Sequence, residues 1–254
     1  MGFFISAIKF IFLLGFLVLI HEGGHFLVAK FFKVKVNEFS IGFGKKLLAK
    51  QKGETLYALR AVPLGGYVLL EGEEEESNDP RAYNNKSVWK RMLIILAGGI
   101  VNIVFGLTVY FILATSIGVN LEPSEDTITN RIYYGFCSTV KFSGSVVNNV
   151  KDLLTGGITT DQLMGPIGIS TVVSKTQGFV DFVYILALIS LSLGITNLLP
   201  FPPLDGGKFV LLVIEAIRRK KLNMELEVNI QAAGFVLMIL LSIYVAYNDI
   251  LRIF

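Results

Sequence analysis

Four long apolar stretches restrict this 254-residue chain to very few architectures. They cover approximately residues 3–32, 92–119, 179–199 and 226–247, and a helix needs about 20 apolar residues to cross the hydrocarbon core of a bilayer. The composition, with 53% hydrophobic and 17% charged residues, is also too apolar for an ordinary soluble domain. We therefore predict a membrane protein that is mainly α-helical and has four transmembrane helices.

The first apolar stretch is expected to stay in the protein. It has no basic segment before it and no small-residue cleavage site after it, so it does not resemble a secretory signal peptide. The single Cys137 excludes an intramolecular disulfide. The chain has a small net charge of +3 and no basic patch interleaved with aromatic residues, so we expect no nucleic-acid partner.

The distribution of basic residues predicts the orientation in the membrane. Lys and Arg are concentrated between Lys33 and Arg91 and again between Lys208 and Lys221, and they are sparse in residues 120–178. The positive-inside rule places the first and third loops in the cytosol and the second loop outside. Both termini are then expected outside.

The sequence His21-Glu22-Gly23-Gly24-His25 ends the first apolar stretch and contains both histidines of the chain. On a helix, residues four apart share a face, so both imidazoles can bind one zinc ion while Glu22 acts as general base. This position predicts hydrolytic chemistry within the bilayer, toward its cytosolic side.

A catalytic zinc ion takes three protein ligands, and the third cannot be another histidine. Cys137 is predicted outside, on the wrong side of the membrane. Asp205 follows a proline-rich break at the end of the third span, Asn197-Leu198-Leu199-Pro200-Phe201-Pro202-Pro203, and an acid at such a break is a candidate ligand. Zinc lowers the pKa of water toward about 7, and Asn197 could donate a hydrogen bond to the developing oxyanion.

Residues 34–44 and 55–70 alternate loosely between apolar and polar side chains and predict β-strands around a Pro-Leu-Gly-Gly turn. The pattern leaves open whether this hairpin is cytosolic or dips into the membrane. The glutamate-rich residues 71–76 predict a solvated loop. In the second span, Asn102 places an amide at membrane depth, where it needs a partner.

The external region is expected to contain a polar linker, residues 122–126, and an amphipathic helix from Arg131 to Leu154 on the outer surface of the bilayer. The domain organisation is then a first core half at residues 1–119, an external segment at 120–164 and a second core half at 165–254.

These motifs together resemble those of the site-2 proteases, a family of zinc-dependent intramembrane proteases. His21–His25 match the family's HExxH, Asn197–Gly206 its NxxPxPxxDG signature, and Gly98–Asn102 its GxxxN motif. Pro63–Val68 resemble its membrane-re-entrant β-loop, and Gly165–Ile169 its GPxGI segment.

The resemblance implies cleavage of single-span membrane proteins within their transmembrane segment, as in regulated intramembrane proteolysis of anti-sigma factors or of remnant signal peptides. The expected substrate contacts are Asn102 and six residues of the β-loop: Pro63, Leu64, Gly65, Gly66, Tyr67 and Val68. Bacterial relatives usually carry one or two PDZ domains between the second and third core helices, and residues 120–164 are too few to form one.

A non-catalytic membrane scaffold or transporter-like protein with a structural zinc site is the alternative, because transporters also use broken helices and intramembrane acids. Glu22 discriminates between the two readings. A hydrolase needs an acid beside its first metal ligand, and a structural site does not.

Overall fold

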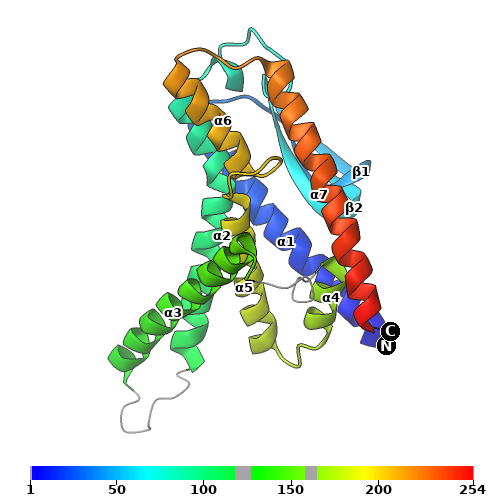
Figure 1. Cartoon of the computed structure of the whole chain (residues 1–254), viewed down its shortest axis with the longest axis vertical. Helices are drawn as coiled ribbons and strands as arrows, with labels where there is room; N and C mark the ends of the chain where they lie inside the picture. Colours follow the sequence, from blue (N-terminus) through cyan, green and yellow to red (C-terminus); the bar gives the residue numbers. More distant parts are fainter. Residues whose placement is uncertain (1, 118–126, 158–164, 254) are drawn as a thin grey trace.

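The computed structural model describes residues 2–117, 127–157 and 165–253. Within them, four helices are long and apolar enough to span a membrane: α1 (Gly2–Phe31), α2 (Val88–Ile117), α5 (Phe179–Asn197) and α7 (Met224–Ile253). The predicted fold class and the four predicted spans are confirmed. Large apolar side chains on these helices, such as Phe12, Val104 and Leu240, are exposed, as expected for surfaces that face lipid. Both termini lie at the same end of the molecule (Figure 1).

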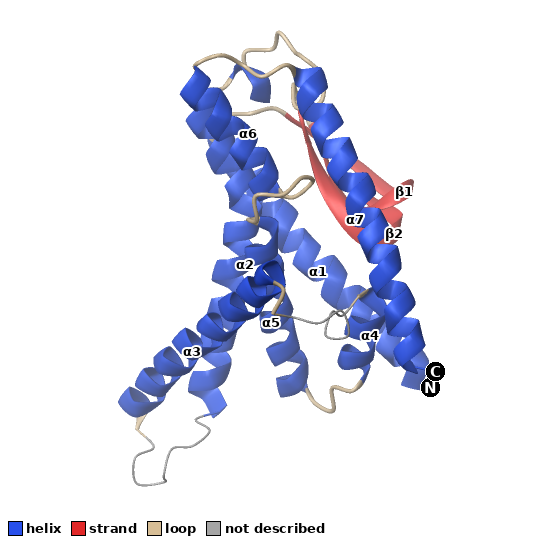
Figure 2. Cartoon of the chain, viewed as in Figure 1, coloured by secondary structure: helices blue, strands red, loops and turns tan. Residues whose placement is uncertain are grey.

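The predicted β-structure is also confirmed, as two long strands between α1 and α2. They are β1 (Val36–Lys52) and β2 (Thr55–Leu70), drawn in red in Figure 2. Residues 38–41 pair with 66–69 on one side and with 56–59 on the other. Because residues 56–59 and 66–69 both belong to β2, this double pairing requires β2 to reverse direction between them, where Gly65 has a φ angle of 146° that favours glycine.

One segment of β2, residues 66–70, forms an edge of this sheet. Among the described residues it pairs only with residues 36–41 of β1. Polar side chains fix the edge from within the sheet, since the Tyr67 hydroxyl donates to Glu38 Oε1 at 2.9 Å and Arg60 Nη2 donates to the same oxygen at 2.6 Å. The edge is therefore held rigidly while one side of its backbone stays available for pairing.

Three buried apolar clusters hold the helices together. The first joins the end of α1 to the sheet, α2 and α6 (Asp205–Arg218), through residues such as Ala29, Val36, Ile94 and Leu212. The second joins α1, α5 and the short α4 (Pro166–Ser174) around Leu13, Leu17, Val173 and Leu186. The third packs α3 (Ile128–Thr155) on α2 and α5 through Phe142, Val146 and Leu191. Together they fix the relative positions of α1, α2 and α6, which carry the site.

The predicted amphipathic helix is present as α3, although its packing is more extensive than the sequence indicates. It runs back along the second half of α2, with Arg131 Nη1 donating to the Ser116 carbonyl at 3.3 Å and Phe142 stacked on Tyr110 at 3.9 Å between ring centroids. Its position on the outer surface of the bilayer stays a prediction. The linker expected at residues 122–126 lies outside the described residues.

Helix α7 is attached to the rest of the molecule at two places. Near its end, Asp249 accepts hydrogen bonds from the backbone N–H groups of Gly165 and Gly168, at 3.0 and 2.8 Å, at the start of α4. Near its middle, Gly234 lies against Pro202, so closely that a Cβ there would be 2.3 Å from the Pro202 carbonyl oxygen. These contacts hold α7 beside the proline-rich segment before α6.

Candidate metal centre and active site

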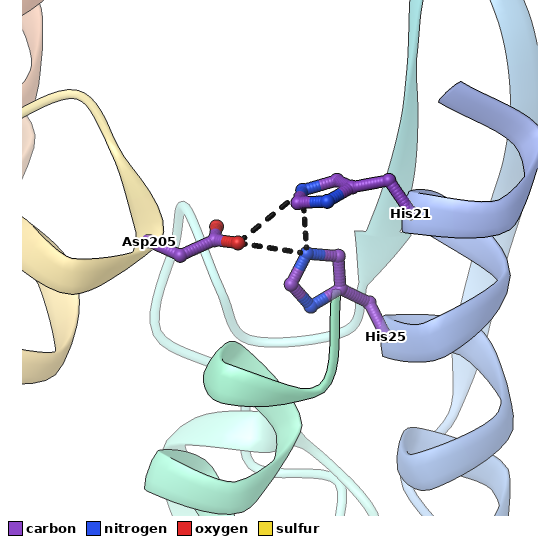
Figure 3. Close-up of side chains that lie close together, drawn as sticks. All are labelled: His21, His25 and Asp205. Carbon is purple, nitrogen blue, oxygen red and sulfur yellow. Dashed lines mark hydrogen bonds and ion pairs between the residues drawn. The ribbon is translucent and has the colours of Figure 1, made fainter. Parts of the chain in front are cut away.

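The two histidines project from one face of α1 toward the first residue of α6, as Figure 3 shows. His21 Nε2 lies 3.2 Å from Asp205 Oδ2, His25 Nε2 lies 3.4 Å from the same oxygen, and the two Nε2 atoms are 3.3 Å apart. The structure thus brings together the three residues that the sequence assigned to the metal. Asp205 lies 180 positions after His25 in the chain.

The spacing of these atoms fits a zinc ion. Three donors held about 2.0–2.1 Å from one zinc ion at tetrahedral angles lie about 3.3 Å from one another. His25 Nδ1 lies 2.8 Å from the Ile94 carbonyl oxygen, which can only accept a hydrogen bond, so Nδ1 carries the proton and Nε2 presents a lone pair. Asp205 Oδ2 is buried without a hydrogen-bond partner. A cation among these atoms resolves the repulsion between their lone pairs.

Glycines place Asp205 at the start of α6. A Cβ on Gly206 would lie 2.3 Å from the carbonyl oxygens of Leu198 and Leu199, and one on Gly207 would lie 2.6 Å from the backbone of Phe201. The chain after α5 therefore folds back tightly over the first turn of α6, and only glycine leaves room for it. This close packing aims Asp205 at the histidines.

Glu22 lies beside the three candidate ligands, in the wall of a cavity of about 600 Å³. The edge segment of β2 comes close to it, since a Cβ on Gly66 would lie 3.3 Å from Glu22 Cγ. The cavity is lined by residues from six parts of the chain: His21, Glu22 and His25 of α1; Tyr67, Val68 and Leu70 of β2; Glu73, Glu74 and Glu75; Ile94 and Ile95 of α2; Asp205 and Lys208 of α6; and Glu227, Gln231 and Phe235 of α7.

Some expected site residues do not line this cavity. Asn102 is fully buried between the helices, with its Nδ2 atom 3.4 Å from His21 Nδ1, so its placement does not support the expected contact with substrate. Asn197 is the last residue of α5 and is not among the lining residues. Gly65 also lies outside the lining, and the side chains of Pro63 and Leu64 are outside the described part of the chain.

The glutamate-rich residues after β2 are more structured than the predicted solvated loop. Glu73 Oε1 accepts a hydrogen bond from Lys208 Nζ at 2.6 Å, across the cavity. Burial alone would lower the Lys208 pKa, but the Glu73 carboxylate outweighs burial and raises this pKa above its ordinary value. Lys208 lies three residues after Asp205 on α6, and that helical spacing was the signal in the sequence that could have found it.

Comparison with known proteins agrees with this site. A model of peptidase family M50 matches residues 9–241. The chain belongs to peptidase family M50. Its resemblance to site-2 proteases is therefore confirmed, and the chain is a membrane metalloprotease whose metal is zinc.

Individual relatives of this M50 protease match over nearly their whole length. A Clostridium acetobutylicum protein named "Putative zinc metalloprotease" is 30% identical over 331 aligned positions, which cover 97% of this chain and 98% of the relative. The Regulator of sigma-W protease RasP of Bacillus subtilis is 24% identical over 418 positions, covering 98% and 99%. Because this chain has 254 residues, both relatives carry additional residues within the aligned stretch.

Proposed function

We propose that this M50 protease cleaves single-span membrane proteins within their transmembrane segment. The observation that carries the proposal is the position of Glu22 and the three candidate ligands on and beside a membrane-spanning helix, at a cavity bounded by an edge strand and α7. A soluble substrate would not need a site at this depth. We also propose that the protein lies in a bacterial inner membrane, with the site toward the cytosol and both termini outside.

In this proposal His21, His25 and Asp205 would hold the zinc ion, and the convergence of their donor atoms supports the assignment. When bound, zinc polarises the scissile carbonyl and lowers the pKa of water toward about 7. Glu22 accepts the proton of the attacking water and passes it to the leaving amine, which completes hydrolysis of the peptide bond. Asn197 has the proposed role of donor to the oxyanion, and it would have to turn toward the cavity to perform it.

The edge segment of β2 has the proposed role of holding the substrate. A peptide bond inside an α-helix is shielded by its own hydrogen bonds, so the substrate helix must unwind before its carbonyl is accessible. An extended substrate segment can add to the free side of residues 66–70 through main-chain hydrogen bonds. Tyr67 and Val68 line the cavity beside Glu22, so a strand added there would lie next to the catalytic residues.

The substrate class is proposed from the relatives and from the membrane location. The Bacillus subtilis relative is named for regulation of sigma-W, which favours anti-sigma factors, and remnant signal peptides share the same single-span chemistry.

The position of the cut tests the proposal. Purified protein in liposomes is incubated with a model substrate that has one transmembrane helix, and the products are weighed by mass spectrometry. We expect the scissile bond to lie within the apolar segment, and we expect the products to disappear when zinc is removed by a chelator and to return when zinc is restored. Cleavage confined to the polar flanks of the helix would contradict the proposal.

A further inference from the structure

Helix α2 presents one narrow stripe to the two histidine ligands. Ile94, Gly98 and Asn102 follow one another at four-residue spacing, so they share a face of α2, and they lie opposite His25 and His21 on α1. The contact is close because Gly98 has no side chain: a Cβ there would lie 2.3 Å from His25 Nε2 and 2.8 Å from His21 Cε1. Both imidazole rings therefore rest against the backbone of α2.

At one end of the stripe, α2 determines which nitrogen of His25 binds metal. His25 Nδ1 donates to the Ile94 carbonyl oxygen at 2.8 Å, and Nε2 is left facing Asp205. Metal-ligating histidines generally donate their second ring N–H to an acceptor in this way, which fixes both the tautomer and the orientation of the ring.

At the other end, His21 Nδ1 has only the Asn102 amide beside it in the described hydrogen-bond network, with Asn102 Nδ2 at 3.4 Å. Because His21 also directs Nε2 at Asp205, binding zinc through Nε2 places a proton on Nδ1, and two donors would then face each other. Asn102 Oδ1, meanwhile, is buried and has no hydrogen-bond partner. The oxygen and nitrogen of an amide exchange places when the group turns by 180°, and that turn gives both atoms suitable partners.

We infer that Asn102 is a positioning residue whose Oδ1 accepts the Nδ1–H hydrogen bond of His21 when zinc is bound. Helix α2 thus orients both histidine ligands, one through a backbone carbonyl and one through a side-chain amide. Asn102 is itself anchored, because the Ser190 hydroxyl on α5 donates to its backbone carbonyl at 2.9 Å and both residues are fully buried. The inference rests on the metal site of the proposed function but not on its substrate.

Zinc affinity of purified variants tests this role. Asn102→Leu removes the acceptor at nearly equal volume, and we expect it to weaken zinc binding about 10- to 100-fold, the usual effect of losing an outer hydrogen-bond partner. Asn102→Asp keeps an acceptor and should stay near the wild-type affinity. The matched control is Thr55→Val, which loses a buried hydrogen bond to the Val36 carbonyl oxygen at nearly equal volume, away from the cavity, and it should bind zinc as tightly as the wild type. The absorption spectrum of the Co²⁺-substituted protein should change only in Asn102→Leu.

Two results would overturn the inference: wild-type zinc affinity in Asn102→Leu, or an equal loss in Asn102→Asp and Asn102→Leu. A second measurement needs no substitution. His21 and His25 are the only histidines, so ¹⁵N-histidine labelling of the zinc-loaded protein reports just their four ring nitrogens. We expect both rings protonated at Nδ1, and a His21 ring protonated at Nε2 would contradict the inference. If the zinc affinities of the variants follow the expected order but the wild-type protein does not cleave single-span substrates, the result would count against the proposed function alone.

Discussion

In the proposed metal site, Asp205 is the third ligand and supplies a charged oxygen beside two neutral nitrogens. Asp205→Asn replaces a carboxylate by a neutral amide, which is a poor zinc ligand, while the side-chain volume hardly changes. We expect zinc affinity to fall about 100-fold or more, beyond the loss expected for an outer hydrogen-bond partner. Competition with a chelator of known affinity measures it.

The matched control for this substitution is Asp181→Asn. Asp181 lies in the first turn of α5, where it accepts a hydrogen bond from the Gln177 N–H, and it does not line the catalytic cavity. The zinc affinity of the Asp181→Asn variant should equal that of the wild type. Tight zinc binding and full proteolysis in Asp205→Asn would show that another residue is the third ligand.

The metal ligands could be predicted from the sequence because each has a local signal. The HExxH spacing places His21 and His25 on one helix face, and a proline-rich break marks Asp205. The partners of these ligands have no such signal. The contact of Asn102 with His21 and that of Ile94 with His25 depend on how closely α2 approaches α1, which is decided by packing around Gly98. A polar residue in an apolar span shows only that a partner exists.

At the scale of elements, the edge segment of β2 has a role that substitution can test. Successive N–H groups along a strand point to opposite sides, so between them Tyr67→Pro and Val68→Pro remove one donor that faces β1 and one that faces away from it. We expect at least the variant that loses the N–H donor facing away from β1 to cleave more slowly, because its pairing with the substrate is weakened. Its zinc content should stay unchanged, because the metal ligands are untouched. Single-turnover cleavage of a single-span substrate measures the rate.

Leu47→Pro is the control for these proline variants. Leu47 is an exposed residue of β1 in the same sheet, and it does not line the cavity. The cleavage rate of the Leu47→Pro variant should stay near that of the wild type. Equal rates for all three proline variants and the wild type would instead indicate a hairpin that does not contact the substrate.

The existence of the four spans and of the strands could be predicted from the sequence, and the arrangement of the elements could not. About 20 consecutive apolar residues are enough to predict a span, and alternation is enough to predict a strand. Nothing in the sequence indicates that α3 folds back along α2. The Glu73–Lys208 pair joins two residues that are 135 positions apart in the chain. A run of glutamates looks the same in the sequence whether it is solvated or paired.

At the scale of the whole molecule, the short segment between the two core halves, which we propose is external, affects the choice of substrate. Relatives with PDZ domains between the two core halves have bulk above the site, which can exclude substrates with large external domains. Here the described part of that segment is mainly α3, which packs on α2 and α5. We expect this protease to cleave substrates whose external domains are larger than a relative with PDZ domains accepts.

A series of substrates with one transmembrane segment and external domains of graded size tests this expectation. The control is a PDZ-containing relative assayed on the same series in the same lipid. The expected result is a gradual decline in rate with domain size for this chain and a sharp cutoff for the relative. The same sharp cutoff in both proteins would place the size filter in the shared core.

We propose that Glu22 performs the proton transfers at a zinc site built by His21, His25 and Asp205. Glu22→Gln isolates this role, because the substitution preserves size and leaves all three proposed ligands in place. Zinc content and cleavage of a single-span substrate are measured on the same preparations of wild type and variant. We predict one zinc ion per chain in both proteins and a cleavage rate lowered by several orders of magnitude in the variant. Near-normal cleavage by Glu22→Gln would contradict the account.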